Sequence, residues 1–388
     1  MTRLHPASAV ISHDEMARFQ FFLGVRGQVF GPVGRGVEDA YKKRVLPKFR
    51  RDHGRDPKDA TEVRRALEQD DIHKIWSWLR RDSQDLLWLY AGESVDRQYG
   101  DIASRCDTAK TSPKGSLALT PGFTAPRYVT EIDTHRMPGN FATEVRPDDL
   151  RAGAVYDLGS AVYQMGMGRK NGQFLNDGRG HTVAAYVFTN YPDLRPKRIL
   201  DMGCSVGQST LPYCDYFPEA ELIATDVGAP MLRYAHARAE LMDKKVSYVQ
   251  DDAEHSAFPD GHFDLIVSHI LFHETSRTAV ANIMAETKRL LAPGGVFVHC
   301  ENPVRAEHMD AYETAWNGWE QYNNSEPYLL GCAKTDFVTL ARDLGFRDAK
   351  AGFIKIVADA RAEKAVTHPP PKGYGYCWYL VSGVNPEP

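Results

Sequence analysis

The sequence lacks the marks of several classes of protein. Its six cysteines lie far apart, and no two of them form a CxxC pair. Such spacing predicts neither a disulfide framework nor a zinc site, and reduced thiols are typical of the cytoplasm. His5 and Pro6 stand where the apolar core of a signal peptide would lie, and no uncharged apolar run approaches the ~20 residues of a membrane span. We therefore expect a cytoplasmic protein without a membrane span or a bound metal.

The chain also lacks an excess of positive charge. Its 47 Lys and Arg against 51 Asp and Glu give a formal net charge of −4, which argues against a broad basic face for nucleic acid. Residues 42–55 are a local exception, with seven basic side chains: Lys42, Lys43, Arg44, Lys48, Arg50, Arg51 and Arg55. Acidic neighbours favour a solvated helix face there. A docking surface for RNA or for a protein substrate is the alternative.

Residues 1–126 are expected to form a mainly helical domain. Segments 36–51, 57–69 and 72–89 are rich in helix formers, and their apolar residues recur at spacings of three and four. The densest apolar group lies in the third segment and is expected to form a core, with an exposed part that can contact a second copy in a homodimer. Residues 107–126 are rich in Thr, Ser, Pro and Gly, which predicts a linker and a domain boundary.

Residues 127–194 are expected to be a connecting and lid segment. In an extended strand Glu131, Asp133 and His135 would share one face, either as a metal or acid–base cluster or as ordinary solvated side chains. Farther along, Tyr163 belongs to a stretch rich in Tyr, Gly and Met. It is expected either to cover a bound ligand or to pack a helix against a sheet.

From residue 197 onward, predicted strands alternate with predicted helices. This order is typical of a parallel sheet with helices on both faces. The strands are expected at 198–202, 221–225, 246–250, 263–268 and 296–300, followed by a last strand near 374–382. The first strand ends at Asp201 and runs into a loop that contains Gly203, Ser205 and Gly207. Such a strand, glycine turn and helix bring backbone close to a nucleotide-like ligand.

Acidic residues end the strands that follow this loop. Asp226 comes at the end of the second strand, where a carboxylate can accept hydrogen bonds from the hydroxyls of a ribose. Asp252 follows the third strand and can accept from an adenine amine. Met231 lies early in the next helix and can cover one face of the base. Each residue alone is an ordinary turn or cap, but their order favours a nucleoside site.

On these residues the chain from about 195 to 388 resembles the class I S-adenosylmethionine-dependent methyltransferases, close to the UbiE-like branch of ubiquinone and menaquinone biosynthesis. The matching motifs are LDMGCSVG (200–207), Asp226, Asp252-Ala253-Glu254, FDLIVS (263–268) and LAPGG (291–295). The resemblance implies S-adenosylmethionine as cofactor, with the glycine loop at its methionine part, Asp226 at its ribose and Asp252–Ala253 at its adenine. It also implies a Rossmann-like α/β fold with a seven-stranded, mostly parallel sheet. Ser205 stands where the commonest pattern has a third glycine.

The loop after the fourth strand carries the candidate catalytic residues. It lacks the Asn/Asp-Pro-Pro-aromatic sequence that methyltransferases of DNA bases and protein glutamine have at this place. It contains His269, His273 and Glu274 instead. A histidine with a pKa near neutrality is a suitable general base, although such residues can also bind the backbone at a helix entry. His269 is expected to lie beside the cofactor as well, and His135 is a further candidate base.

The preferred function is methyl transfer to a small acceptor by in-line displacement. Residues 301–330 are rich in aromatic side chains, namely Tyr312, Trp316, Trp319, Tyr322 and Tyr328. They favour a flat aromatic or hydrophobic acceptor, with O-methylation as the first choice, unless they pack a helix against the N-terminal domain. The alternatives are a methyltransferase of RNA or protein, and a binding or regulatory protein that keeps the fold without the chemistry.

Overall fold

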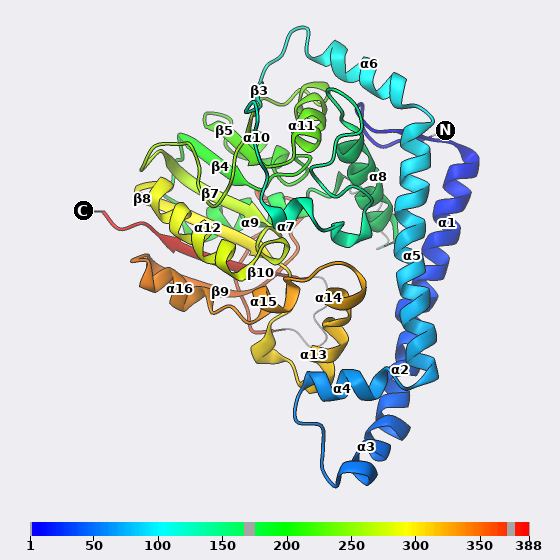
Figure 1. Ribbon diagram of the computed structural model, residues 1–388. Coiled ribbons are helices and arrows are strands. Elements are labelled where there is room, and N and C mark those ends of the chain that lie inside the picture. Colours follow the sequence, from blue (N-terminus) through cyan, green and yellow to red (C-terminus); the bar gives the residue numbers. More distant parts are fainter. Residues whose placement is uncertain (1, 167–174, 371–376, 388) are drawn as a thin grey trace.

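The computed structural model describes residues 2–166, 175–370 and 377–387 (Figure 1). Its centre is an eight-stranded sheet of order β3-β6-β5-β4-β7-β8-β10-β9. The strands of this sheet are β3 (Ser116–Ala118), β4 (Arg198–Met202), β5 (Glu221–Asp226), β6 (Ser247–Gln250), β7 (Phe263–His269), β8 (Leu291–Glu301), β9 (Arg347–Lys355) and β10 (Cys377–Val384). All neighbours are parallel except β10, which is antiparallel to both β8 and β9. The mostly parallel α/β fold is thus confirmed.

The sheet has one strand more than the expected seven. The additional edge strand is β3, which pairs in parallel with β6 and comes from the segment expected to be a linker. Gly115, just before β3, comes so close to the backbone that a Cβ there would lie 2.1 Å from the carbonyl oxygen of Val246. The small residues of this segment therefore allow β3 to pair closely with β6. Residues 107–126 thus contain a strand of the sheet as well as loop.

Helices cover both faces of the sheet, and each face has its own core. On one face lie α9 (Gly178–Asn190), α10 (Leu211–Tyr216) and α11 (Ala229–Leu241). On the other lie α12 (Arg277–Leu290) and α16 (Phe337–Asp343). Helices on both faces explain why the central strands are almost continuously apolar.

The N-terminal helices share a core with the sheet domain. A two-stranded ribbon, β1 (Thr2–Arg3) and β2 (Val10–Ile11), precedes α1 (His13–Gln28), α5 (Asp71–Asp96) and α6 (Tyr99–Ala109). Helix α8 (Arg151–Gly166) packs between α5 and α11, and one apolar cluster extends from Ala7 to Ala237. The division at residue 126 stays a prediction, but these helices bury their apolar faces against the second half of the chain.

Where α1 ends and α5 begins, a fourth, smaller core joins the two halves of the chain (Figure 1). It contains α2 (Gly34–Ala40), α3 (Leu46–His53) and α4 (Ala60–Leu67), with a π-helical turn before and after α2. From the second half come α13 (Ala311–Asn317) and α14 (Trp319–Asn323), which belong to the aromatic segment. The helix that follows, α15 (Leu329–Ala333), packs instead on α12 and on the turn after β7. Trp316 stacks on Trp76 with ring centroids 4.4 Å apart, and Tyr312 stacks on Tyr41. Most of the aromatic side chains therefore pack against the N-terminal helices.

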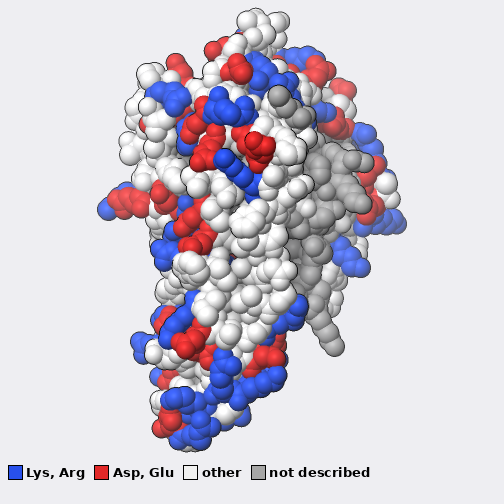
Figure 2. All heavy atoms as spheres, turned by 90° about the vertical axis from the view of Figure 1, so that its right-hand side faces the viewer, with Lys and Arg blue, Asp and Glu red and all other residues white. Residues whose placement is uncertain are grey.

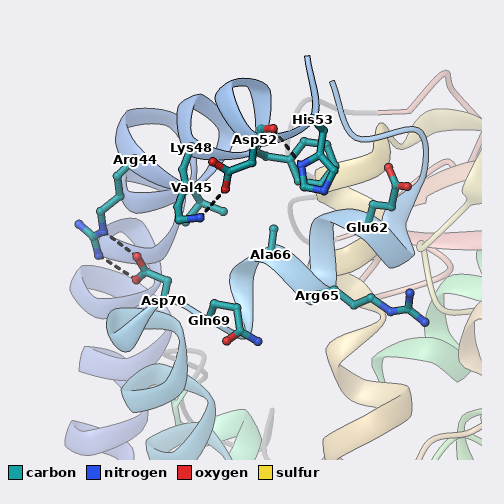
Figure 3. A pocket seen from close by; sticks show the side chains of 11 residues that line it. Arg44, Val45, Lys48, Asp52, His53, Glu62, Arg65, Ala66, Gln69 and Asp70 are labelled. Atoms are coloured by element: carbon teal, nitrogen blue, oxygen red, sulfur yellow. Dashed lines mark hydrogen bonds and ion pairs between the residues drawn. The ribbon is translucent and has the colours of Figure 1, made fainter. Parts of the chain in front are cut away.

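The basic stretch at 42–55 lies on the π-helical turn Tyr41–Val45, on α3 and on the residues just after it, and its charges are largely paired. Lys42 binds Glu38, Lys43 binds Asp39 and Lys48 binds Asp52 at a spacing of four residues. Arg44 forms two hydrogen bonds to Asp70, and Figure 3 shows this pair together with the Lys48–Asp52 pair beside a surface pocket. At the lower end of Figure 2, blue and red side chains alternate accordingly. This favours the solvated-face interpretation.

The segment around His135 is not the expected strand. It forms a short helix, α7 (Arg127–Thr130), and a 3₁₀ turn at Thr134–Arg136. Glu131 is exposed and bound to Arg127, while His135 points elsewhere into a buried site. Residues 167–174 of the expected lid lie outside the described residues.

Three expected absences can be compared with the described residues. None of their helices is long and apolar enough to cross a bilayer. Their six cysteines are free thiols, and no described group of His, Cys, Asp and Glu is arranged to hold a metal ion.

Candidate functional site

The glycine loop after β4 depends on left-handed backbone conformations. Gly203 and Gly207 have φ of +69° and +72°, and a Cβ at either would lie within 2.6 Å of a neighbouring side chain. Ser205 has φ +52°, a region that favours glycine. This accounts for the third glycine of the commoner pattern. The Oγ of Ser205 is buried and has no hydrogen-bond partner in the described protein.

A cavity of about 100 Å³ lies over the loop and the carboxyl ends of β5 and β6. Its lining contains the following predicted cofactor residues: Gly203, Ser205, Asp226, Met231, Asp252, Ala253 and His269. Asp226 accepts hydrogen bonds of 2.8 Å from the backbone N–H groups of Ser205 and Gly228. Burial raises the pKa of Asp226. Ligand hydroxyls at this carboxylate would offset the cost of burying it.

The predicted residues Asp201, Gly207 and Tyr163 are not in this lining. Asp201 is fully buried below the loop, where it accepts from Thr210 at 2.6 Å and lies 3.1 Å from His269 Nδ1. Gly207 packs against the hydroxyl of Tyr248. Asp201 and Gly207 therefore support the loop from behind. Tyr163 binds Gln84 and lines a different cavity.

The residues of this cavity suit S-adenosylmethionine. A nucleoside joined to an amino acid needs hydrogen-bonding groups and room close to the backbone. The cavity offers the buried carboxylate of Asp226, the unpartnered hydroxyl of Ser205 and the space left by the missing Cβ of Gly203. The connecting segment closes the cavity with Tyr128, Phe141 and Tyr156. These three aromatic residues were not predicted as site residues, because their sequence pattern is equally typical of packing.

A second, larger cavity of about 490 Å³ adjoins the first. Tyr156 and Ile270 line both. The second cavity lies between the N-terminal helices and the aromatic segment, and it is lined by Arg26, Phe30, Arg80, Gln84, Trp88, His135, Tyr163, Arg179, His273, Trp319, Glu320, Glu326, Trp378 and several amide side chains. Of the five aromatic residues expected to wall an acceptor pocket, Trp319 is found there. The lining is more polar and more cationic than a purely hydrophobic acceptor would require.

Three of the four candidate catalytic residues lie in one chain of hydrogen bonds at the border of the cavities. His135 Nε2 lies 2.8 Å from Glu274, and its Nδ1 lies 2.9 Å from Glu326. His273 Nε2 lies 3.4 Å from the same Glu274 oxygen, and its Nδ1 lies 2.7 Å from Glu301. Carboxylates and imidazoles therefore alternate in the order Glu326, His135, Glu274, His273, Glu301. We call this row the Glu–His chain.

The carboxylates of the Glu–His chain raise the pKa of both imidazoles. Burial by itself would lower the pKa of His273, but Glu301 and Glu274 outweigh it and raise this pKa to about 10. Burial likewise opposes the charge on His135, yet Glu274 and Glu326 raise its pKa well above the ordinary value. The pKa of Glu274 is depressed by the two imidazoles against the effect of burial. The two histidines thus form a coupled group with their carboxylates, and a catalytic role for them stays a prediction.

His269 takes no part in the Glu–His chain. Its Nδ1 is bound to Asp201 and its Nε2 lies 3.0 Å from the hydroxyl of Tyr213. Both ring nitrogens thus have partners, and His269 lines the cofactor cavity. Its role as a base stays a prediction.

Backbone strain is concentrated around the two cavities. His135 and Arg136 have φ of +56° and +60°, and the His135 carbonyl accepts hydrogen bonds from Trp88 and Gln84. Ile270, where the cavities meet, has φ +55°, which is rare for a β-branched residue. Such conformations persist where surrounding contacts impose them, as at functional sites.

Two carboxylates of the Glu–His chain were missed in the sequence. Glu301 is the last residue of β8, so the rule that placed Asp226 and Asp252 at strand ends would also have found it. Glu326 lies between two short helices, and no sequence pattern marks it. Its place depends on how the aromatic segment folds back over the site.

Comparison with known proteins gives a family for this arrangement. A methyltransferase-domain family model matches residues 199–295. A demethylmenaquinone methyltransferase of Thermus thermophilus is 36% identical over 108 residues, which are 28% of this chain and 48% of that protein. An uncharacterized methyltransferase of Synechocystis is 30% identical over 183 residues, which are 44% of this chain and 78% of that protein. The chain thus spans about half the length of the first relative.

Among solved structures, a phosphoethanolamine N-methyltransferase 2 of Haemonchus contortus in complex with S-adenosyl-L-methionine aligns with 49% of this chain and 49% of its own. The identity is 19% and the TM-score 0.37, so this likeness is too distant to bear on the acceptor. The family model includes the glycine loop, and the Synechocystis relative is matched over most of its own length. By its C-terminal half, the chain belongs to the class I S-adenosylmethionine-dependent methyltransferases, whose cofactor is S-adenosylmethionine.

Proposed function

We propose that this protein transfers a methyl group to a small acceptor bound in the larger cavity, with a hydroxyl oxygen as the favoured acceptor atom. The observation that carries the proposal is the junction of the two cavities at Tyr156 and Ile270. The Glu–His chain lies there, with Glu274 in the lining of the cofactor cavity and His273 in that of the larger one. An acceptor and a cofactor would meet beside these groups.

The residues of the smaller cavity are proposed to hold S-adenosylmethionine, which when bound supplies an electrophilic methyl group on a charged sulfur. Asp226 is assigned to the ribose hydroxyls, Asp252 and Ala253 to the adenine edge, and Met231 to the adenine face. Gly203 and Ser205 are assigned to the methionine part. Holding two reactants in line is the main source of acceleration in such a displacement.

The Glu–His chain is proposed to receive the proton of the acceptor hydroxyl. Three carboxylates and two protonated imidazoles have a net charge of −1, so the chain can take up one proton and become neutral. Glu326 borders the larger cavity and is the entry point for that proton, because the raised pKa of His135 leaves its ring nitrogens no lone pair to accept one. The buried His273 and Glu301 then share the charge. A coupled group of this kind acts as a base although neither imidazole is neutral beforehand.

The cofactor assignment is tested by Asp226→Asn. We expect affinity for S-adenosylhomocysteine to fall about 10- to 100-fold, because hydrogen bonds to a charged group contribute about 1.5–3 kcal/mol. Isothermal titration calorimetry on the full chain measures this. Asp264→Asn is the matched control, since Asp264 also accepts two backbone N–H groups, those of Lys197 and Arg198, away from the cavity. Equal affinity of the Asp226 variant and wild type would refute the assignment.

The reaction itself is tested by incubating the protein with S-adenosylmethionine and phenolic compounds. The Thermus relative is named for a demethylated quinone, so flat phenols are the first compounds to try. Mass spectrometry detects the methylated product, and the release of S-adenosylhomocysteine reports turnover. A protein that binds the cofactor tightly and methylates none of a broad set of small acceptors, RNAs or proteins would instead be a binding or regulatory protein.

A methyltransferase of RNA or protein is the second candidate, and the paired charges of residues 42–55 count against it. The larger cavity is lined by helices and aromatic side chains and has a volume of about 490 Å³, which suits a small molecule better than a polymer. A cytoplasmic location stays a prediction.

We also propose a homodimer through the outer face of α1 and α5. Large apolar side chains are exposed there, among them Phe21 (60% exposed), Ile75 (50%), Trp78 (61%) and Leu89 (53%). Figure 2 shows this side of the molecule, with few charged side chains across its middle. Exposed apolar patches of this kind mark interaction sites.

The dimer predicts a response to Trp78→Lys. We expect wild type to have the mass of two chains in light scattering at micromolar concentration, and the variant to have the mass of one chain, because a charge in the centre of an apolar contact opposes association. Tyr322→Lys, a similarly exposed aromatic side chain on α14, is the control. A monomeric wild type would contradict the proposal.

A further inference from the structure

The larger cavity has more positive charge than an apolar acceptor needs. Arg26 of α1, Arg80 of α5 and Arg179 of α9 line it, and the carboxylates among its described lining residues are Glu320 and Glu326. Glu326 is already bound to an imidazole of the Glu–His chain. One carboxylate, Glu320, therefore faces three guanidinium groups. This excess of positive charge favours a negatively charged ligand.

The guanidinium of Arg80 is held in a cage of rings. Its carbon lies 4.6 Å, 5.1 Å and 4.2 Å from the ring centroids of Phe30, Trp76 and Trp319. One of its nitrogens binds Glu320, whereas Nη1 is buried and has no hydrogen-bond partner among the described residues. The side chain is only 8% exposed. An unpartnered buried donor destabilises a protein unless a ligand supplies the acceptor.

Arg26 lies beside this cage and is free to bind a ligand. Its guanidinium is 4.4 Å from the ring centroid of Phe30 and 4.5 Å from that of Tyr163. In the described part of the chain no carboxylate forms an ion pair with Arg26. With its faces against aromatic rings, the N–H edge of the guanidinium remains for a planar or tetrahedral anion.

We infer that the acceptor is an aromatic molecule with an anionic group, a carboxylate or a phosphate monoester, bound by Arg26 and Arg80. The aromatic body would lie against Trp88 and Trp319, and its hydroxyl would face the Glu–His chain. This inference rests on the proposed function, because it takes the larger cavity as the acceptor site. The volume of about 490 Å³ accommodates such a molecule.

Three probes with the same ring test the inference. We would titrate 4-hydroxybenzoate, 4-hydroxyphenyl phosphate and the neutral isostere 4-hydroxybenzamide into the full chain loaded with S-adenosylhomocysteine. The acid that Arg26 and Arg80 recognise is expected to bind at least about 10-fold more tightly than the amide, because charge-assisted hydrogen bonds are lost in the amide. Whichever of the two acids binds more tightly shows whether the site prefers a carboxylate or a phosphate.

Variants assign the preference to the arginines. Arg26→Gln is expected to abolish the preference for the acid, and Arg26→Lys to retain part of it. Arg81→Gln is the matched control, because Arg81 is an exposed arginine next to Arg80 on α5. A preference that survives Arg26→Gln, equal binding of all three probes, or no binding of any probe would each overturn the inference.

The same titrations separate this inference from the proposed function. Binding of the probes is measured without turnover, and binding of S-adenosylhomocysteine is measured beforehand. If an Arg26-dependent preference is found while no methyl transfer occurs, the anion site stands and the proposed reaction fails. If methyl transfer to a neutral phenol is unaffected by Arg26→Gln, the reaction stands and the anion site fails.

Discussion

Replacing His273 with glutamine is expected to lower turnover by about 10²- to 10⁴-fold, the usual contribution of a positioned acid–base group. Affinity for S-adenosylhomocysteine should change little, since His273 lies in the lining of the larger cavity and is not found in that of the cofactor cavity. Single-turnover rates and calorimetry measure the two quantities. His13→Gln is the control, because that side chain is 96% exposed on α1.

The same substitution also affects stability, and a second variant separates the two effects. Without the imidazole, Glu274 and Glu301 lose a buried positive partner, which costs about 3–5 kcal/mol in comparable buried pairs. His273→Gln combined with Glu301→Gln removes one of the unpaired charges, so it should recover stability without recovering turnover. If turnover returns along with stability, His273 is structural and the proposed proton path is wrong.

The raised pKa of His273 also predicts how stability depends on pH. Its folded pKa of about 10 lies above the ordinary value of 6.5. The stabilisation is therefore fully present below about pH 6.5 and is lost as the pH rises through 10. In urea titrations, the free energy of unfolding of wild type should fall over this range more steeply than that of His273→Gln.

Replacing Asp157 with asparagine is expected to reduce the free energy of unfolding by about 3–5 kcal/mol. Asp157 lies on α8 and is buried. It accepts from His5 at 2.6 Å, and from Tyr234 and Gln208 at 2.8 Å. It thereby ties the N-terminus and α11 to the residue that follows the glycine loop. An asparagine keeps the shape of the side chain, but its amide NH2 replaces one carboxylate oxygen. That NH2 would face a hydrogen-bond donor of His5, Gln208 or Tyr234 in place of an acceptor.

Urea unfolding followed by circular dichroism measures this loss. Asp215→Asn is the control, because Asp215 is 56% exposed in its pair with Lys244 and its loss should change stability by less than about 0.5 kcal/mol. His5 and Arg238 next to Asp157 depress the pKa of Asp157 against the effect of burial. The contribution is therefore present above the ordinary carboxyl pKa and is lost as the pH falls through the depressed value. Equal stability of the two variants would contradict a structural role for Asp157.

The part of the fold that follows local rules was predictable from the sequence. The strands expected from 198 to 300 appear as β4 to β8 at nearly the expected places. Strands buried on both faces of a parallel sheet are short apolar runs bounded by turn residues, and this pattern is visible in the sequence. Asp226 and Asp252 meet in one cavity since the carboxyl ends of parallel strands lie at one edge. β3 was missed because three residues in a Ser- and Gly-rich segment have no pattern of their own.

The catalytic region was predictable only in part. His273 and Glu274 follow β7 and were found by their position, and His135 was chosen for a wrong reason, as a member of a strand. Its actual place depends on a strained turn that Trp88 and Gln84 hold by hydrogen bonds. Contacts between residues so far apart in the chain leave no local signal.

By itself the sequence determined the central strands of the sheet and the glycine loop, because these depend on the order of residues along strands and turns, and the motifs they carry implied the cofactor through the family resemblance. Only the tertiary structure decided what the first half does: it packs on α8 and α11 and, with the aromatic segment, encloses a cavity lined by three arginines and bordered by the Glu–His chain. The physical reason is that a cavity is built from side chains of distant elements, whose charge and burial become defined only when the chain has folded.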